Sequence, residues 1–234
     1  MHGASTASGS TPRPTGLIHW LVLLGILSVA AASCASSNAG IPASATTLRS
    51  DPTPSTTQRP VVIVVGDSIT DLTSAALHRR LDDDVVLAAE GVHGALAADM
   101  LPTTMRLADM HPDVAVINLG TNDATLGLAT DVTEAALRDH LERLESAECR
   151  WLVTITERPG PPFRAAAHAI NARLRAIAAS EVGVGLVDWQ AALDADSAAG
   201  SPTGPLLSDD IHPTGAGTTL LVDLLAAAID SPCD

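Results

Sequence analysis

The chain has 234 residues, of which 27 are acidic and 13 are basic, giving a formal net charge of -14 at pH 7 and a pI near 4.7. This length is enough for one α/β domain and too short for two large ones. The charge would repel nucleic acid and anionic membrane surfaces at long range, and three Trp, one Phe and no Tyr leave few rings on which bases could stack. We therefore expect no nucleic-acid partner.

The N-terminal segment is typical of an export signal. The mostly apolar run Leu17–Ala32 has the length of a signal peptide core and is short for a membrane-spanning helix. Small residues then precede Cys34, so that residues 1–34 resemble a signal peptide ending in a bacterial lipobox, whose cysteine is acylated. Ala31 stands where a lipobox usually has Leu, which leaves ordinary cleavage and an uncleaved anchor as alternatives. We expect an exported protein, either secreted or held as a lipoprotein on the outer face of the cell membrane.

The next segment, residues 35–59, is rich in Ser, Thr, Pro and Ala and has few large apolar side chains. It cannot bury enough surface to offset the entropy of ordering, so we expect a disordered linker before a folded domain at residues 60–234. Two further cysteines, Cys149 and Cys233, lie in that domain. If Cys34 is acylated, an even pair remains in an oxidising compartment, which favours a disulfide; two free thiols are the alternative.

From Pro60 onwards, short β-branched runs alternate with amphipathic stretches. The first run, Val61–Val65, is continuously apolar, as expected of a parallel strand covered on both faces. Alternating strands and helices predict right-handed crossovers, and therefore a three-layer α/β/α sandwich around a parallel sheet of about five strands. The expected strands are Val61–Val65, Val85–Ala89, Val114–Asn118, Trp151–Thr156 and Val184–Asp188, and the expected helices are Leu72–Leu81, Ala95–Met110, Val132–Ser146, Arg164–Ser180 and Gly215–Ile229.

Functional groups in such a sheet gather beyond the carboxyl ends of the strands. Ser68 follows the first strand directly and lies where the next helix would begin. Exposed N–H groups and the helix dipole favour developing negative charge there, which suits a nucleophile. The alternative is that Ser68 only caps the helix, as serine often does.

A serine hydroxyl is a weak nucleophile until a base takes its proton. Of the eight histidines, His212 stands apart because Asp209 precedes it by three residues, just before the last helix. Asp209 could fix the tautomer of the ring and leave the second nitrogen facing Ser68, although Asp210 is a nearby rival. We expect His93 to line the pocket. The pairings His-x-x-x-His and Cys-x-x-Cys do not occur in the sequence, so we expect no metal and no other cofactor.

Two further segments could supply hydrogen-bond donors to an oxyanion. The third strand is followed by Gly120 and Asn122, and the second strand by a loop that contains Gly91 and Gly94. A side-chain amide and a backbone N–H at this edge can be directed at the oxygen of a tetrahedral intermediate. An Asn-rich turn and an ordinary glycine loop are the simpler interpretations.

These four segments resemble, in order and spacing, the four sequence blocks of the SGNH (GDSL-type) hydrolase family, over about Val61 to Ile229. The resemblance implies a flavodoxin-like fold, with Ser68 as nucleophile, His212 as general base and acid, and Asp209 orienting His212. It also implies an oxyanion hole formed by the N–H groups of Ser68 and Gly94 and the side-chain amide of Asn122.

The resemblance therefore predicts a serine esterase that hydrolyses carboxylic esters of a small-molecule or glycan substrate. The short loops after the third, fourth and fifth expected strands favour small acyl groups such as acetyl, and we expect a monomer. One alternative keeps the same residues in an O-acyltransferase or deacetylase of cell-envelope polysaccharide. Another is a catalytically silent binding module of the envelope. The nucleophile elbow of α/β-hydrolases is excluded because Gly66-Asp67-Ser68-Ile69-Thr70 lacks its second glycine.

Overall fold

The structure is a computed structural model that describes residues 58–81 and 83–233. Cys34, the expected signal peptide and most of the expected linker lie outside these residues. None of the helices in the described ranges combines the length and the apolar character needed to cross a membrane.

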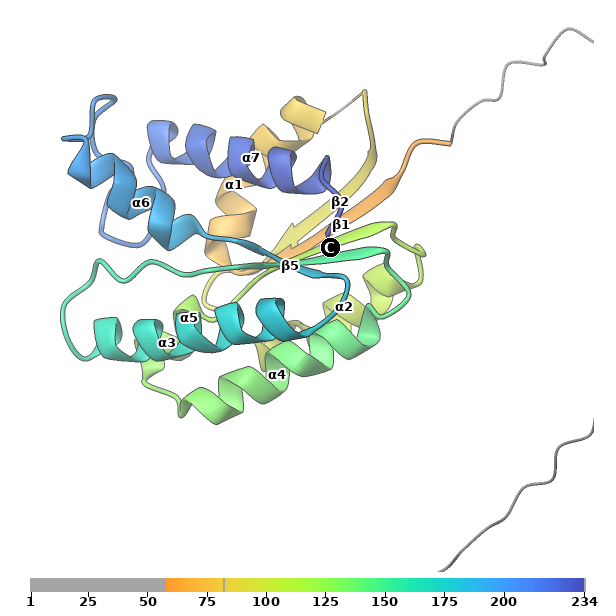
Figure 1. The fold of residues 1–234 in the computed structure, drawn as a ribbon, viewed down its shortest axis with the longest axis horizontal. Helices are drawn as coiled ribbons and strands as arrows, with labels where there is room; N and C mark the ends of the chain where they lie inside the picture. The colour runs from red at the N-terminus through yellow and green to blue at the C-terminus, as the bar shows by residue number, and fades with distance from the viewer. Residues whose placement is uncertain (1–57, 82, 234) are drawn as a thin grey trace, which may run out of the picture. The chain divides into compact units, whose positions relative to one another are not determined.

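A single parallel sheet forms the middle of the domain, as the sequence predicts (Figure 1). Its strands are β1 (Val61–Gly66), β2 (Val86–Gly91), β3 (Val114–Asn118), β4 (Cys149–Val153) and β5 (Val184–Val187). Their order across the sheet is β2-β1-β3-β4-β5, and every neighbouring pair is parallel. The carboxyl ends of all five strands therefore meet at one edge.

Helices cover both faces of the sheet (Figure 1). One face carries α1 (Ser68–Leu81), α6 (Trp189–Ala198) and α7 (Gly215–Ile229). The other carries α2 (Leu101–Ala108), α3 (Thr121–Leu126), α4 (Thr130–Arg143) and α5 (Phe163–Ser180), with the short 3-10 helix η1 (Ala98–Met100) before α2. The predicted three-layer sandwich is confirmed.

The alternation of side chains along β1 divides the core into two clusters. Val62 and Val64 pack with residues of α1, α6 and α7, whereas Ile63 and Val65 pack with residues of α2, α4 and α5. Successive side chains of a strand point to opposite faces, so a continuous apolar run is what a sheet covered on both sides requires. The site-bearing edge is thus supported by two packed layers.

The helices differ from the sequence prediction in several bounds: α1 begins at Ser68 and not at Leu72, and α4 spans Thr130–Arg143 and not Val132–Ser146. The expected helix at Ala95–Met110 begins only at Ala98, because Ala95 and Ala97 form hydrogen bonds with side chains of other elements. The sequence prediction missed α3, which follows Gly120, and α6, which Asp188 caps by accepting the N–H of Ala191. The last helix, Gly215–Ile229, has the predicted bounds.

Cys149 and Cys233 form a disulfide in the structure. Cys149 is the first residue of β4, so the bond ties the amino end of this strand to the C-terminal segment after α7. The two residues are 84 positions apart in the sequence. A cross-link over so long a stretch restricts the unfolded chain strongly.

Candidate active site

Ser68 is the first residue of α1 and lies at the carboxyl end of β1. The residue that caps this helix is its neighbour Asp67, whose Oδ1 accepts the N–H of Ile69 at 3.0 Å. Ser68 does not cap the helix; its Oγ lies 3.0 Å from Nε2 of His212, 144 residues further along the chain. The fold therefore brings together the serine and the histidine singled out in the sequence.

Asp209 holds the other side of the His212 ring. Its Oδ2 is 2.7 Å from Nδ1, and its Oδ1 accepts the backbone N–H groups of His212 at 2.7 Å and Ile211 at 3.1 Å. A carboxylate can only accept, so Nδ1 carries the hydrogen and Nε2 is left with a lone pair toward Ser68. This arrangement allows His212 to take the hydroxyl proton.

The same contacts keep Asp209 ionised. The hydrogen bonds from the backbone N–H and the ring of His212 lower the pKa of Asp209 from 3.8 to about 2. The rival residue, Asp210, has a left-handed backbone conformation with a φ of 67°. The backbone carbonyl of Asp210 accepts a hydrogen bond from the hydroxyl of Thr156. Asp209 is thus the carboxylate that contacts the ring of His212.

Gly94 lies in a reverse turn after β2. The turn is closed by the N–H of Ala95, which donates to the carbonyl of Val92 at 3.2 Å. Gly94 has a φ of +76°, the left-handed region that glycine adopts without strain. Its N–H belongs to the central peptide of the turn, which the turn's own hydrogen bond does not use.

Asn122 is the second residue of α3, directly after the turn at Gly120, whose φ of +115° favours glycine. The side-chain Nδ2 of Asn122 donates to the carbonyl of Ala95 at 2.9 Å. An amide nitrogen carries two hydrogens, so one remains for a second acceptor. The Asn122 side chain is therefore tied to the residue that follows Gly94.

His93 contacts α1 through its ring. Its Nε2 lies 2.8 Å from Oδ2 of Asp71, and both side chains are exposed. The ring therefore joins the loop of Gly94 to the first turn of the helix that begins at Ser68. Asp71 had no expected role, since nothing in its sequence context marks it.

Asp67 and Asp123 are buried carboxylates that the sequence analysis did not assign. Each directly adjoins a candidate residue, Ser68 or Asn122, and each is at most 2 % exposed. Burial raises the pKa of Asp67 to about 6. An acidic residue directly after a continuously apolar strand is the signal that could have marked Asp67 as buried.

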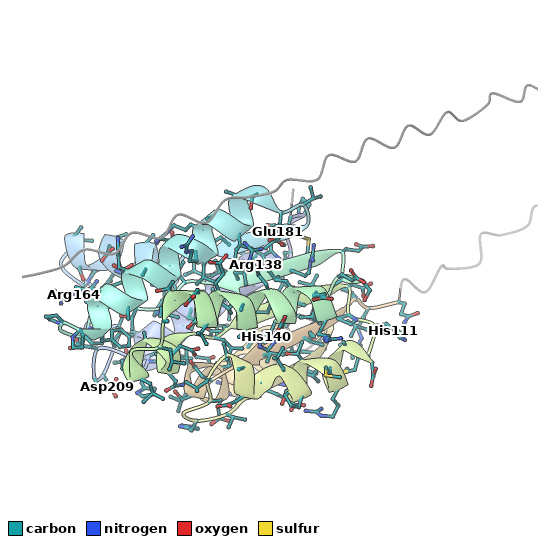
Figure 2. All side chains as sticks on the ribbon, turned by 90° about the horizontal axis from the view of Figure 1, so that it is seen from below. His111, Arg138, His140, Arg164, Glu181 and Asp209 are labelled. Atoms are coloured by element: carbon teal, nitrogen blue, oxygen red, sulfur yellow. A yellow bond between two sulfur atoms is a disulfide. The ribbon has the colours of Figure 1, made fainter. Side chains whose placement is uncertain are left out.

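All the residues of the site lie at the carboxyl edge of the sheet. Figure 2 shows Asp209 at the same end of the domain as Arg164, which follows β4, and His111, which precedes β3, at the opposite end. No group of three or more His, Cys, Asp or Glu side chains within residues 58–81 and 83–233 could hold a metal ion. A serine and a histidine in contact at this edge are typical of serine hydrolases.

Comparison with models of protein families identifies the family of the chain. Residues 55–220 match the model of the GDSL-like lipase/acylhydrolase family, and the chain belongs to this family of esterase-type hydrolases. Comparison with curated protein sequences gives no significant match.

Several solved structures are similar to this fold. TesA is 26% identical, with 73% of this chain and 98% of TesA covered and a TM-score of 0.58. A catalytic mutant of Axe2, an acetylxylan esterase from Geobacillus stearothermophilus, is 20% identical, with 75% and 96% covered and a TM-score of 0.63. A member of the lipolytic G-D-S-L family from Veillonella parvula is 16% identical, with 71% and 96% covered and a TM-score of 0.60.

Proposed function

We propose that the chain is a serine esterase that hydrolyses carboxylic ester bonds through Ser68, His212 and Asp209. The observation that carries the proposal is the continuous hydrogen-bond chain from the Ser68 hydroxyl through the His212 ring to Asp209. Two similar structures, in which Axe2 has a serine or a histidine replaced by alanine, are described as catalytic mutants. A serine and a histidine are thus the positions changed in catalytic mutants of a protein with the same fold.

In the proposed reaction, Nε2 of His212 takes the Ser68 proton while Oγ attacks the ester carbonyl carbon. The tetrahedral intermediate collapses as the imidazolium returns the proton to the leaving alcohol, and an acyl-enzyme remains. Water then attacks the acyl group with the same base and releases the acid. Ionised Asp209 stabilises the imidazolium in both halves of the reaction and keeps its orientation.

The oxyanion of each intermediate would be bound by the N–H groups of Ser68 and Gly94 and by Nδ2 of Asn122. Ser68 lies at a helix N-terminus, where N–H groups lack partners within the helix. The turn at Gly94 leaves the N–H of that residue unused by its own closing bond, and Asn122 has a second amide hydrogen to offer. Three donors that are fixed before substrate binds need no reorganisation during the reaction.

We propose small acyl groups, such as acetyl, as the acyl part of the substrate. One observation favours a glycan as the alcohol part: Axe2, which shares the fold, is an acetylxylan esterase. A deacetylase of acetylated polysaccharide, or an O-acyltransferase that passes the acyl group to a sugar instead of water, would use the same residues. Both reactions share the acyl-enzyme and differ only in the acceptor.

The test uses purified protein and p-nitrophenyl esters of graded chain length, beside acetylated xylan and acetylated cell-wall glycan. We expect hydrolysis to be fastest for the acetyl ester and to be lost in Ser68→Ala. Release of free acetate in the presence of a sugar acceptor identifies a hydrolase, whereas acylated sugar identifies a transferase. Hydrolysis by Ser68→Ala at the wild-type rate would refute the proposal.

We further propose that the protein is exported and tethered to the membrane by lipid on Cys34. The support is the apolar run and the small residues before Cys34 in the sequence. Bacteria that express the full chain and are fed alkyne-tagged palmitate should yield labelled protein in the membrane fraction. Cys34→Ala should abolish the label; a label retained in that variant would contradict the tether.

A further inference from the structure

The backbone of Ala97 is held on both sides by buried polar side chains. Its N–H donates to Oδ2 of Asp123 at 3.0 Å, and its carbonyl lies 2.8 Å from Nε2 of His140. Asp123 comes from α3 and His140 from α4, and both side chains are almost fully buried. Figure 2 shows His140 on α4, near the middle of the view. Polar groups placed this deep require partners, and they select one position for the segment that satisfies them.

The hydrogen bonds fix the state of the His140 ring. The carbonyl of Ala97 can only accept, so Nε2 carries a hydrogen and donates it. Nδ1 lies 2.6 Å from the hydroxyl of Thr104, which also lies 3.3 Å from the carbonyl of Met100. The shorter contact indicates that Thr104 donates to Nδ1. Burial lowers the pKa of His140, so the ring is neutral and has a single tautomer.

Asp123 is also held in place from two sides. Its Oδ1 accepts the hydroxyl of Thr133, at the start of α4, at 3.1 Å, while its Oδ2 receives the N–H of Ala97. The carbonyl of Ala97 additionally accepts the N–H of Met100 at 3.3 Å and so begins η1. The segment of Ala97 is therefore anchored to α3 and α4 at the point where the loop becomes helical.

This anchored segment begins at Gly94. Residues 94–97 are held at two points. Asn122 of α3 donates to the carbonyl of Ala95. Asp123 of α3 and His140 of α4 bind the N–H and the carbonyl of Ala97. Two of the three proposed oxyanion donors thus depend on this loop. A shift of the loop would move the N–H of Gly94 and loosen the Asn122 side chain together.

We propose that His140 is a positioning residue for the oxyanion hole: through the carbonyl of Ala97 it holds the Gly94 loop against α3. This inference rests on the proposed esterase function and adds a residue that lies outside the four sequence blocks. Its effect is on the transition state, because the N–H of Gly94 is needed most when the carbonyl oxygen becomes negative. Ground-state binding of a small ester should depend on it little.

The experiment compares His140→Leu, which fills a similar volume without a donor, with His140→Gln, whose amide can still donate to Ala97. We expect His140→Leu to lower kcat roughly 10- to 100-fold with KM changed less than about threefold. His140→Gln should recover kcat to within about fivefold of wild type. Thermal unfolding of each variant reports stability separately.

A matched control removes a hydrogen bond at the opposite edge of the sheet. Asp113 accepts the N–H of Val61 at 2.7 Å at the amino ends of the strands, so Asp113→Ala should lower stability and leave kcat within about twofold of wild type. In an Asn122→Ala background, the effect of His140→Leu on kcat should shrink to less than about threefold, because the α3 donor that depends on the same loop is already lost.

Loss of kcat in His140→Leu, together with recovery in His140→Gln, supports the inference. An unchanged kcat in a folded but destabilised His140→Leu would overturn it and leave the esterase function intact, provided Ser68→Ala is inactive. Activity retained in Ser68→Ala would overturn both. If His140→Leu does not fold, Thr104→Val decides: we expect kcat to fall roughly three- to tenfold at constant KM, and an unchanged kcat contradicts the proposal.

Discussion

Asp67 should limit the stability of the domain at neutral pH. The side chain has no exposed surface, and Oδ1 accepts the N–H of Ile69. The hydroxyl of Thr121 lies close enough to lower the pKa of Asp67, yet Asp67 Oδ2 and Thr121 Oγ1 each lack a hydrogen-bond partner among the described residues. One oxygen of a buried carboxylate is thus poorly compensated, and burial is the largest cause of its raised pKa.

The sign of the pH effect follows from the two states of the chain. In the folded protein the pKa of Asp67 is about 6, against an ordinary value of 3.8. Between these values the folded state keeps a proton that the unfolded chain has released, so stability falls as pH rises from about 4 to about 6. The shift of roughly two units corresponds to a penalty of about 3 kcal/mol above pH 6.

Asp67→Asn should remove most of this penalty. The amide keeps the acceptor for Ile69, and its nitrogen can donate to Thr121 Oγ1. We expect the variant to gain about 2 to 3 kcal/mol at pH 8, roughly 5 to 10 °C in Tm, and little at pH 4.

The assay is urea unfolding of wild type and variant at pH 4, 6 and 8, with Asp230→Asn as an exposed control. The control should change stability by less than about 0.5 kcal/mol at each pH. If Asp67→Asn were equally stable with wild type at pH 8, or if its gain were the same at pH 4 and pH 8, the account of a poorly compensated buried charge would be wrong.

Three further substitutions test the site and the disulfide. Asn122→Ala should lower kcat roughly 100- to 1000-fold in steady-state ester hydrolysis with little change in KM, and a change confined to KM would contradict its role as an oxyanion donor. Asp209→Asn should lower kcat roughly 100- to 10,000-fold, because an amide can also donate a hydrogen bond and so no longer fixes the hydrogen on Nδ1 of His212. Wild-type turnover would exclude Asp209 as the orienting group. Cys233→Ser should lower the free energy of unfolding by about 2 to 5 kcal/mol in urea titration under oxidising conditions, and equal stability would show that the disulfide contributes nothing.

The strands could be predicted because their sequence pattern has one physical meaning. A run such as Val61–Val65 has no polar side chain to expose, so only a strand covered on both faces accommodates it. The long helix Gly215–Ile229 was equally clear. The short helices α3 and α6 were harder to predict. The first turn of α3 consists of residues that favour turns, and α6 has only ten residues, so packing against the rest of the domain is needed to select the helical state.

The residues of the candidate site could be predicted where their position in the sequence relative to strand ends marks them. Ser68 and Asn122 lie shortly after strand ends, and His212 lies shortly before the last helix. The parallel topology brings the strand ends to one edge. The contacts among Ala97, Asp123 and His140 could not be predicted, because they join residues that lie far apart in the sequence. One sequence gives no indication of which buried groups form hydrogen bonds with one another.

The central claim is that His212 activates Ser68 for attack. Reaction of the purified domain with a fluorophosphonate, followed by mass spectrometry of its peptides, tests it most directly. We expect one adduct per chain, on Ser68, and at least a roughly 100-fold slower reaction in His212→Ala. An adduct on another residue, or labelling of Ser68 at the same rate without His212, would contradict the account.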